Sequence, residues 1–176
     1  MLSVFMDCGP DDRKLAATLS SLVPGAVDGI VREVVLVDRA MGVDARKVAE
    51  HAGCRVVSAE ALGEAIGQAR GDWLLLLEPG ARLQPGWIAA VADHLETAGG
   101  AHAVTPAARF RRAAIDRPGF LARLRRRPAA LSHGFLVRRS HAVGLFGKGR
   151  TVRPLEHIAK GVAVVRLDGE IRPAQP

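Results

Sequence analysis

Three acidic residues in the first half of the chain each close a short apolar run. They are Asp7, Asp38 and Glu78, and Glu78 leads directly into the turn Pro79-Gly80. Apolar runs of this length between helical segments predict parallel strands that are buried on both faces. Ligands of such sheets bind at the carboxyl ends of the strands, where carboxylates hold cations or accept hydrogen bonds. The sequence therefore predicts one polar site that is built from these three acids.

The elements that position these acids alternate between strand and helix. We expect strands at 2–6, 33–38, 55–57 and 73–77, and helices at 12–24, 45–52, 61–69 and 85–98. Beyond residue 100 the pattern is less regular, with strands expected at 101–105, 134–137 and 162–167 and a short helix at 139–145. The fold class is therefore α/β, with a mostly parallel central sheet and helices on both faces.

Length and composition favour one domain, 1–176. Of its 176 residues 48% are hydrophobic, which is enough for a substantial core. No apolar run reaches about 18 residues, the length that a membrane-spanning helix needs. The first residues contain no basic stretch and meet Asp7 early, which is not typical of a signal peptide. Cys8 and Cys54 stand alone, as expected of free thiols in a reducing compartment, so we predict a cytoplasmic protein.

Charge divides the chain into two halves. Residues 1–100 carry nine basic and 14 acidic side chains, whereas residues 101–176 carry 16 basic and four acidic ones. The basic stretch 109–127 would attract phosphate-rich partners such as nucleotide diphosphates or anionic lipid headgroups. Nucleic acid is disfavoured, because the arginines lack interleaved aromatic residues and no nucleic-acid motif is present. The alternative is that these arginines form a solvated surface without a partner.

The order of several motifs resembles the family 2 glycosyltransferases of the GT-A fold, over most of the chain. Residues 69–74, Ala-Arg-Gly-Asp-Trp-Leu, are similar to the lead into the metal-binding strand of that family. Residues 82–87, Arg-Leu-Gln-Pro-Gly-Trp, are similar to the segment that follows it. Residues 33–38 match the second strand of the family, and 133–139 resemble the strand on the acceptor side. The resemblance is greatest to small bacterial members.

This resemblance implies transfer of a sugar from a nucleotide-diphosphate sugar to an acceptor hydroxyl, with Mg²⁺ or Mn²⁺ as cofactor. It implies that residues 1–100 form the nucleotide-binding half, with Asp7 and Asp38 on the nucleotide. The basic half, 101–176, would then face the acceptor. Glu78 is expected on the diphosphate and its cation. The donor sugar and the acceptor are not indicated by the sequence.

The departures from the family fall on residues that do chemistry. The acid that commonly acts as the base belongs to a Glu-Asp pair, which is Glu156-His157 here. Glu156 and His157 are therefore the candidate catalytic residues, since a carboxylate or a neutral imidazole accepts a proton near neutral pH. The Asp-x-Asp metal motif is Glu78-Pro79-Gly80, and Gly80 has no side chain to offer a cation.

These departures leave two hypotheses of different classes. In the first, the protein is a glycosyltransferase of weak or lost activity, in which arginines of the second half replace the cation by pairing with the diphosphate. In the second, it is a non-catalytic module that binds a nucleotide, a partner protein or an anionic membrane surface. The membrane contact would run through 109–127, at the periphery of the inner membrane. Nucleotide binding, and its dependence on manganese, separates the two.

Overall fold

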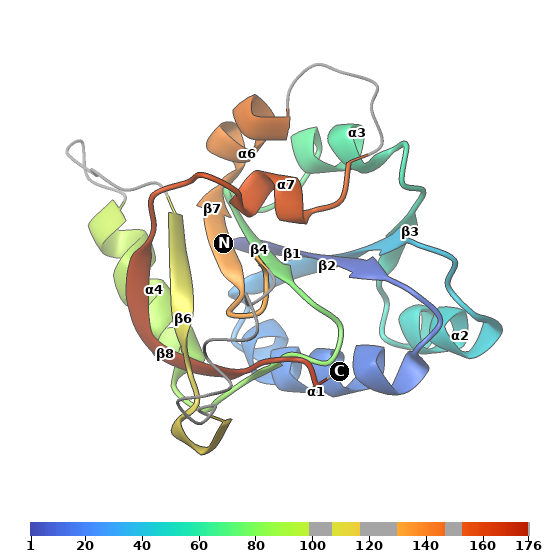
Figure 1. The fold of residues 1–176 in the computed structure, drawn as a ribbon, viewed down its shortest axis with the longest axis horizontal. Coiled ribbons are helices and arrows are strands. Elements are labelled where there is room, and N and C mark those ends of the chain that lie inside the picture. Colours follow the sequence, from blue (N-terminus) through green and yellow to red (C-terminus); the bar gives the residue numbers. More distant parts are fainter. Residues whose placement is uncertain (99–106, 117–129, 147–152, 176) are drawn as a thin grey trace, which may run out of the picture.

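The computed structural model describes residues 1–98, 107–116, 130–146 and 153–175. At its centre is a sheet of eight strands with helices on both sides (Figure 1). Within the described segments, every helix is too short or too polar to span a lipid bilayer. The strand expected at 101–105 lies outside the described residues.

Four parallel strands form one half of the sheet. They are β1 (Leu2–Cys8), β2 (Val31–Asp38), β3 (Arg55–Val57) and β4 (Trp73–Leu77), in the spatial order β3-β2-β1-β4. All three neighbouring pairs are parallel. The four carboxyl ends therefore lie along one edge of the sheet, called the carboxyl edge below, and the opposite edge is called the amino edge.

The other half of the sheet is mixed. It consists of β7 (Phe135–Arg138), β6 (Ala107–Arg112), β8 (Val165–Arg172) and β5 (Arg82–Leu83), placed in that order beyond β4. The β4–β7, β7–β6 and β8–β5 pairs are antiparallel, whereas β6 and β8 are parallel. Neither β5 nor β6 was predicted from the sequence. β5 has only two residues, and the arginines of β6 obscure the alternation that marks a strand.

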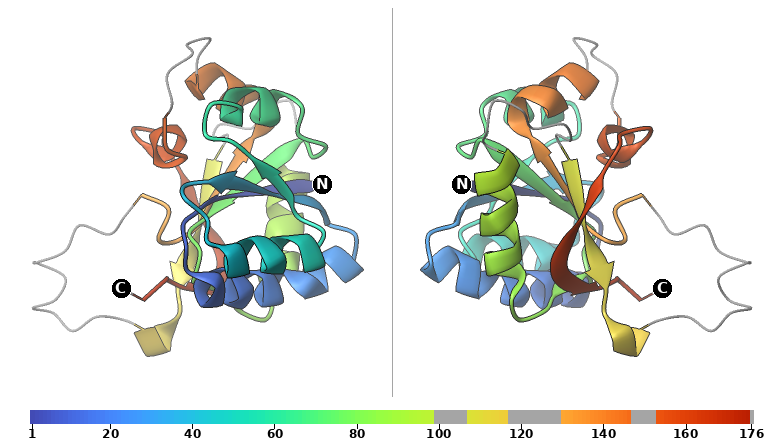
Figure 2. Two further views of the ribbon diagram at one scale, coloured as in Figure 1. Left: turned by 90° about the vertical axis from the view of Figure 1, so that its right-hand side faces the viewer. Right: turned by 90° about the vertical axis from the view of Figure 1, so that its left-hand side faces the viewer.

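Helices cover both faces of the sheet (Figures 1 and 2). One face carries α1 (Asp12–Val27), α2 (Val43–His51) and α4 (Trp87–Ala98), which share one apolar cluster. The other face carries α3 (Leu62–Gly67), α6 (Arg139–Phe146) and the short α7 (Glu156–Ala159), which share a second cluster. A single 3-10 turn, Ala114–Asp116, follows β6. Because both faces are covered, the side chains of β4 are buried along its whole length, as the uninterrupted apolar run predicts.

Two boundaries differ from the sequence prediction. α1 continues through Pro24 to Val27, because the Pro24 carbonyl still accepts the Asp28 N–H at 2.9 Å and the last turn stays closed. β8 runs from Val165 to Arg172 rather than over 162–167. Its inward-facing residues alternate as expected of a strand, and they pack towards α4 in the first cluster.

A polar cluster at the amino edge fastens the start of β4 to its neighbours. Ser3 Oγ donates a hydrogen bond to Glu33 Oε1 at 2.7 Å and accepts one from the Gly71 N–H at 2.8 Å. The same Glu33 oxygen accepts the Arg70 N–H at 2.7 Å. A Cβ at Gly71 would lie 2.6 Å from backbone atoms of Leu2 and Ser3. The close approach of two backbones therefore requires glycine at this place.

Candidate functional site

The three acids predicted to form a site lie on the carboxyl edge. β1 stands between β2 and β4, so Asp7, Asp38 and Glu78 come from three adjacent strand ends. Asp7 and Asp38 belong to opposite faces of the sheet. Cys8, the register partner of Asp38, packs in the α1–α2 cluster, and side chains alternate along a strand. The structure thus brings the three backbone positions together and divides their carboxylates between two faces.

Asp7 holds the chain segment that leads into α7. Its Oδ1 accepts a hydrogen bond from Arg39 Nε at 2.9 Å, and its Oδ2 accepts the Leu155 N–H at 2.9 Å. Arg39 also donates from Nη2 to the Arg153 carbonyl at 3.0 Å. The Asp7 and Arg39 side chains are about three-quarters buried, at 23% and 26% exposure, so this is a charge-assisted link. Asp7 therefore positions the 153–155 segment across the ends of β1 and β2.

Asp38 closes the turn that follows β2. Its Oδ1 accepts the Met41 N–H at 2.8 Å, and its Oδ2 forms an ion pair with Arg46 of α2. The backbone hydrogen bond from Met41 is the main cause that lowers the pKa of Asp38, with the Arg46 charge adding to it. Ala40 in this turn has a φ of 62°, a conformation that favours glycine. Asp38 is thus an ionised carboxylate at the carboxyl edge, and its contacts with Met41 and Arg46 hold the turn after β2 in place.

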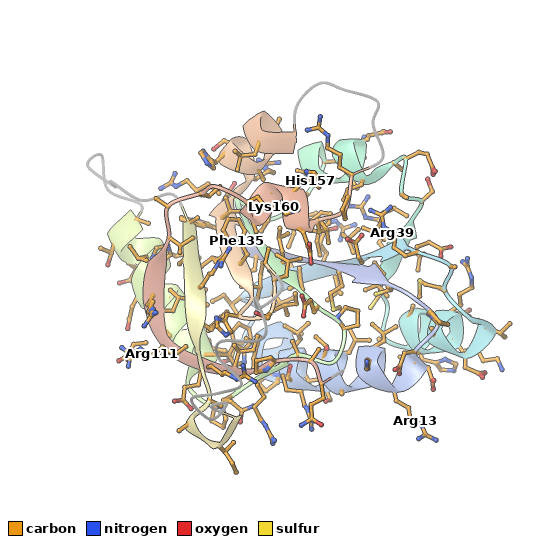
Figure 3. The ribbon with its side chains drawn as sticks, in the orientation of Figure 1. Arg13, Arg39, Arg111, Phe135, His157 and Lys160 are labelled. Atoms are coloured by element: carbon orange, nitrogen blue, oxygen red, sulfur yellow. The ribbon has the colours of Figure 1, made fainter. Side chains whose placement is uncertain are left out.

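Glu78 and Glu156 come from two distant parts of the chain and lie close enough for their charges to interact. Burial raises the pKa of Glu78, and the negative charge of Glu156 raises it further. Glu156 is the first residue of α7 and is partly buried, whereas His157 is exposed (Figure 3). Of the two candidate bases, the structure therefore places Glu156 beside the predicted diphosphate residue and His157 at the surface.

Two carboxylates bind a divalent cation only together with further oxygen ligands. Among the described residues no group of three or more His, Cys, Asp or Glu side chains could hold a metal ion. Magnesium is commonly held by one or two carboxylates together with phosphate oxygens of a substrate. Glu78 and Glu156 supply two carboxylates that repel each other, and a cation would remove that repulsion. The donor set thus suits a cation that arrives with a diphosphate.

The residues around Gly80 leave little space for a side chain at this position. Its φ is 98°, and a Cβ there would lie 3.1 Å from the Ala174 side chain and 3.3 Å from Lys14. The Gly80 N–H donates to Thr18 Oγ1 at 2.8 Å. The position that corresponds to the second acid of the Asp-x-Asp motif is therefore lined by the C-terminal segment and by α1. A left-handed backbone and close neighbours both oppose a larger residue here.

Arg39 is a site residue that the sequence analysis did not single out. It stands directly after Asp38, and its guanidinium turns back to Asp7 on the neighbouring strand. Figure 3 shows Arg39 near the ends of β1 and β2. Its position one residue past a strand-end acid was the available signal. Without the strand order, however, nothing in the sequence shows which acid it would meet.

Solved structures show which class of proteins has this fold. Glucosyl-3-phosphoglycerate synthase from Mycobacterium tuberculosis, in complex with Mn²⁺, UDP and phosphoglyceric acid, is similar with a TM-score of 0.65 and 20% identity, over 100% of this chain and 71% of that chain. The complex of that enzyme with Mg²⁺ and UDP gives a TM-score of 0.64 at 20% identity, over 100% and 72%. No protein-family model matches the sequence, and no curated protein does.

The likeness establishes the fold. The chain has the GT-A fold of nucleotide-sugar glycosyltransferases, as predicted from its motifs, and an α/β architecture with helices on both faces of the sheet. A third solved structure, described as a mycobacterial protein, has a TM-score of 0.64 and 20% identity over 100% of this chain and 68% of that chain.

Proposed function

We propose that the protein binds a nucleotide-diphosphate sugar at the carboxyl edge and transfers the sugar to an acceptor hydroxyl. The observation that carries this proposal is the pair Glu78 and Glu156, which β4 and α7 bring together at the edge where such sheets bind ligands. Residues 1–100 would bind the nucleotide and residues 101–176 the acceptor. The solved neighbours support a nucleotide-sugar donor, since they were crystallised with UDP or UDP-glucose.

In the proposed reaction the acceptor oxygen forms a bond to the anomeric carbon, and the bond from that carbon to the diphosphate breaks. The Glu156 carboxylate accepts the hydroxyl proton. A divalent cation, when bound, would neutralise the charge on the departing diphosphate. Glu78 would hold that cation, with Glu156 next to it. Asp38 keeps the turn after β2 in place at the nucleotide side, through its bond to Met41.

The test is nucleotide binding followed by turnover. We expect millimolar UDP, GDP or ADP to raise the melting temperature in the presence of Mn²⁺, because a ligand of the folded state stabilises it. Glu78→Gln should remove the manganese-dependent part of the rise. Asp72→Asn is the matched control, because Asp72 is an exposed acid, at 82%, just before β4 on the amino edge. No shift with any nucleotide, with or without Mn²⁺, would refute the proposal.

A second candidate, nucleotide binding without sugar transfer, is favoured by two observations. Both Asp7 oxygens are already engaged, and the surroundings of Gly80 leave little room for a second carboxylate. In that case the melting temperature would rise with a nucleotide while no sugar would be released from UDP- or GDP-sugars. Of the membrane contact predicted for 109–127, residues 117–127 lie outside the described residues.

A further inference from the structure

Helix α7 carries Glu156, but its own residues fix it only in part. Leu155, Ile158 and Ala159 are almost fully buried in the second apolar cluster. Apolar burial has no preferred direction, so it holds the helix against the sheet without setting the direction of the Glu156 side chain. The helix has four residues, and its N-cap residue, Leu155, has no polar side chain to cap it. Other contacts must therefore set where Glu156 lies.

Asp7 and Arg39 supply such contacts directly before Glu156. The Leu155 N–H donates to Asp7 Oδ2 at 2.9 Å, and the Arg153 carbonyl accepts from Arg39 Nη2 at 3.0 Å. The two side chains are themselves joined by a hydrogen bond from Arg39 Nε to Asp7 Oδ1 at 2.9 Å. One ion pair thus holds two backbone groups that are two residues apart, and Glu156 is the next residue in the chain.

The segment between these two contacts has little freedom of its own. Pro154 has a fixed φ and no N–H to donate. Its carbonyl accepts the His157 N–H at 3.0 Å, and the Leu155 carbonyl accepts the Ile158 N–H at 3.1 Å. A displacement at the ion pair would therefore pass into the first turn of α7, where Glu156 is, and would not be absorbed before it.

The contacts of Arg39 use the shape of its guanidinium. The group donates in two directions, from Nε to a carboxylate of β1 and from Nη2 to a carbonyl of the segment before α7. A planar guanidinium holds both acceptors in one fixed geometry, whereas a lysine ammonium on its flexible stem does not. Only 26% of the Arg39 side chain is exposed, so these charge-assisted bonds are stronger than those of a pair in open solvent.

The far end of α7 is held separately. Arg109 Nη2 donates to the Ala159 carbonyl, the last of the helix, at 3.1 Å. Glu156 is at the end that Asp7 and Arg39 hold. Loss of their contacts would thus release the end of α7 that bears the carboxylate, while the other end stays attached.

We propose that Arg39, acting with Asp7, is a positioning residue for Glu156: it fixes the first turn of α7 so that the Glu156 carboxylate meets the acceptor hydroxyl. This inference rests on the proposed function, in which Glu156 accepts the hydroxyl proton. It gives Asp7, whose two carboxylate oxygens are both engaged, a role at the base. It also connects the two halves of the chain, since Arg39 directly follows β2 and Glu156 begins α7.

The first test measures release of free sugar from UDP-glucose, GDP-glucose and ADP-glucose by the whole protein with Mn²⁺. Water is then the acceptor: its oxygen bonds to the anomeric carbon, its proton goes to Glu156, and the nucleoside diphosphate leaves. We expect Arg39→Gln to lower kcat about 10- to 100-fold, since a displacement of about 1 Å in a catalytic group has effects of this size. The KM for the donor should stay within about twofold, because no donor contact is removed.

A double-mutant cycle shows whether Arg39 acts through Glu156. In a Glu156→Gln background, Arg39→Gln should lower kcat by less than about a further twofold, because no carboxylate is left to direct. Arg39→Lys keeps the charge without the planar fork and should lower kcat at least about fivefold. It also keeps the test valid if Arg39→Gln does not fold.

Arg139→Gln is the matched control. Arg139 makes the same two kinds of contact at the amino edge, an ion pair with Asp72 at 3.7 Å and a hydrogen bond from Nη1 to the Ala69 carbonyl at 2.9 Å. Its loss should leave kcat within about twofold of the native value. Equal losses of kcat in Arg39→Gln and Arg139→Gln would overturn the inference. So would a raised donor KM in Arg39→Gln that persists in the Glu156→Gln background, because Arg39 would then act on the nucleotide.

The native protein separates failure of this inference from failure of the proposed function. If it releases sugar and Arg39→Gln releases sugar equally fast, only the inference is wrong. If it releases no sugar from any of the three donors, sugar transfer is wrong, and so is the role of Glu156 that Arg39 would serve.

Discussion

The surroundings of Glu78 disfavour the charged form of its carboxylate. Its pKa is raised above the ordinary value by burial and by Glu156, so the folded state holds the proton more tightly than the unfolded state does. The stabilising contribution of the Glu78 side chain is fully present at acidic pH, below the pKa of a glutamate in the unfolded chain. It is lost as the pH rises through the pKa of Glu78 in the folded protein. Disfavoured charges of this kind gather at functional sites.

Replacing Glu78 with glutamine should therefore stabilise the protein at neutral pH. The melting temperature of Glu78→Gln should exceed that of the native protein at pH 7, and the difference should shrink towards zero as the pH falls below about 4. Melting curves from pH 3.5 to 8 check this. Asp72→Asn should show no such pH-dependent gain, and an equal gain in both variants would assign the effect to net charge instead.

Glu156 and His157 can be told apart by kinetics. If Glu156 accepts the acceptor proton, Glu156→Gln should lower kcat by about 10²- to 10⁴-fold. His157→Gln should leave kcat within about twofold, because its side chain is exposed. Sugar release and transfer from the donor that binds best provide the measurement. A larger loss in His157→Gln than in Glu156→Gln would reverse the assignment.

At the scale of elements, α7 depends on side chains rather than on its own length. It has only four residues, and an isolated helix of that length does not form in water. Asp7 holds the segment before it, and Arg109 holds its last carbonyl. Removing the charge in Asp7→Asn should lower the free energy of unfolding by about 1–2 kcal/mol. Hydrogen exchange at 155–159 should accelerate more than exchange in β4, and equal acceleration everywhere would show that Asp7 stabilises the whole fold.

The strand β4 depends on the close approach of the chain at Gly71. Gly71→Ala should lower the free energy of unfolding by about 1–3 kcal/mol, because its Cβ would meet backbone atoms that cannot rotate away. Gly67→Ala is the matched control, since a Cβ at Gly67 meets nothing within 4 Å. Urea unfolding of the two variants gives the comparison. Equal stability of the two would show that β1 can shift to make room.

At the scale of the molecule, the two thiols report on global unfolding. Burial raises the pKa of Cys8 to about 12 and that of Cys54 to about 11. At pH 8 the reactive thiolate is then on the order of one part in 10³ to 10⁴, against about a quarter for a free cysteine. We expect iodoacetamide to label the folded protein at least about 100-fold more slowly than the unfolded one. Fast labelling of Cys54 alone would indicate local opening of the region between α2 and β3.

The sequence predicted the parallel half of the fold well, and the mixed half poorly. Continuous apolar runs such as 73–77 give a strong signal, because a strand buried on both faces has few other compositions. The arginines of β6 hide a strand whose inward residues are mostly alanine. Of the candidate site, the three edge acids followed from strand ends. The approach of Glu156 to Glu78 and the link from Asp7 to Arg39 depend on long-range packing, which spacing in the sequence does not encode.

The last described residues pass beside the turn at Gly80, with Ala174 in contact distance, while Met1 lies next to the start of β4 at the opposite edge. A fluorophore attached after Gln175 would thus sit within reach of the proposed sugar-transfer centre and could signal its occupation. An affinity tag placed before Met1 would be far from that centre and would leave it unobstructed.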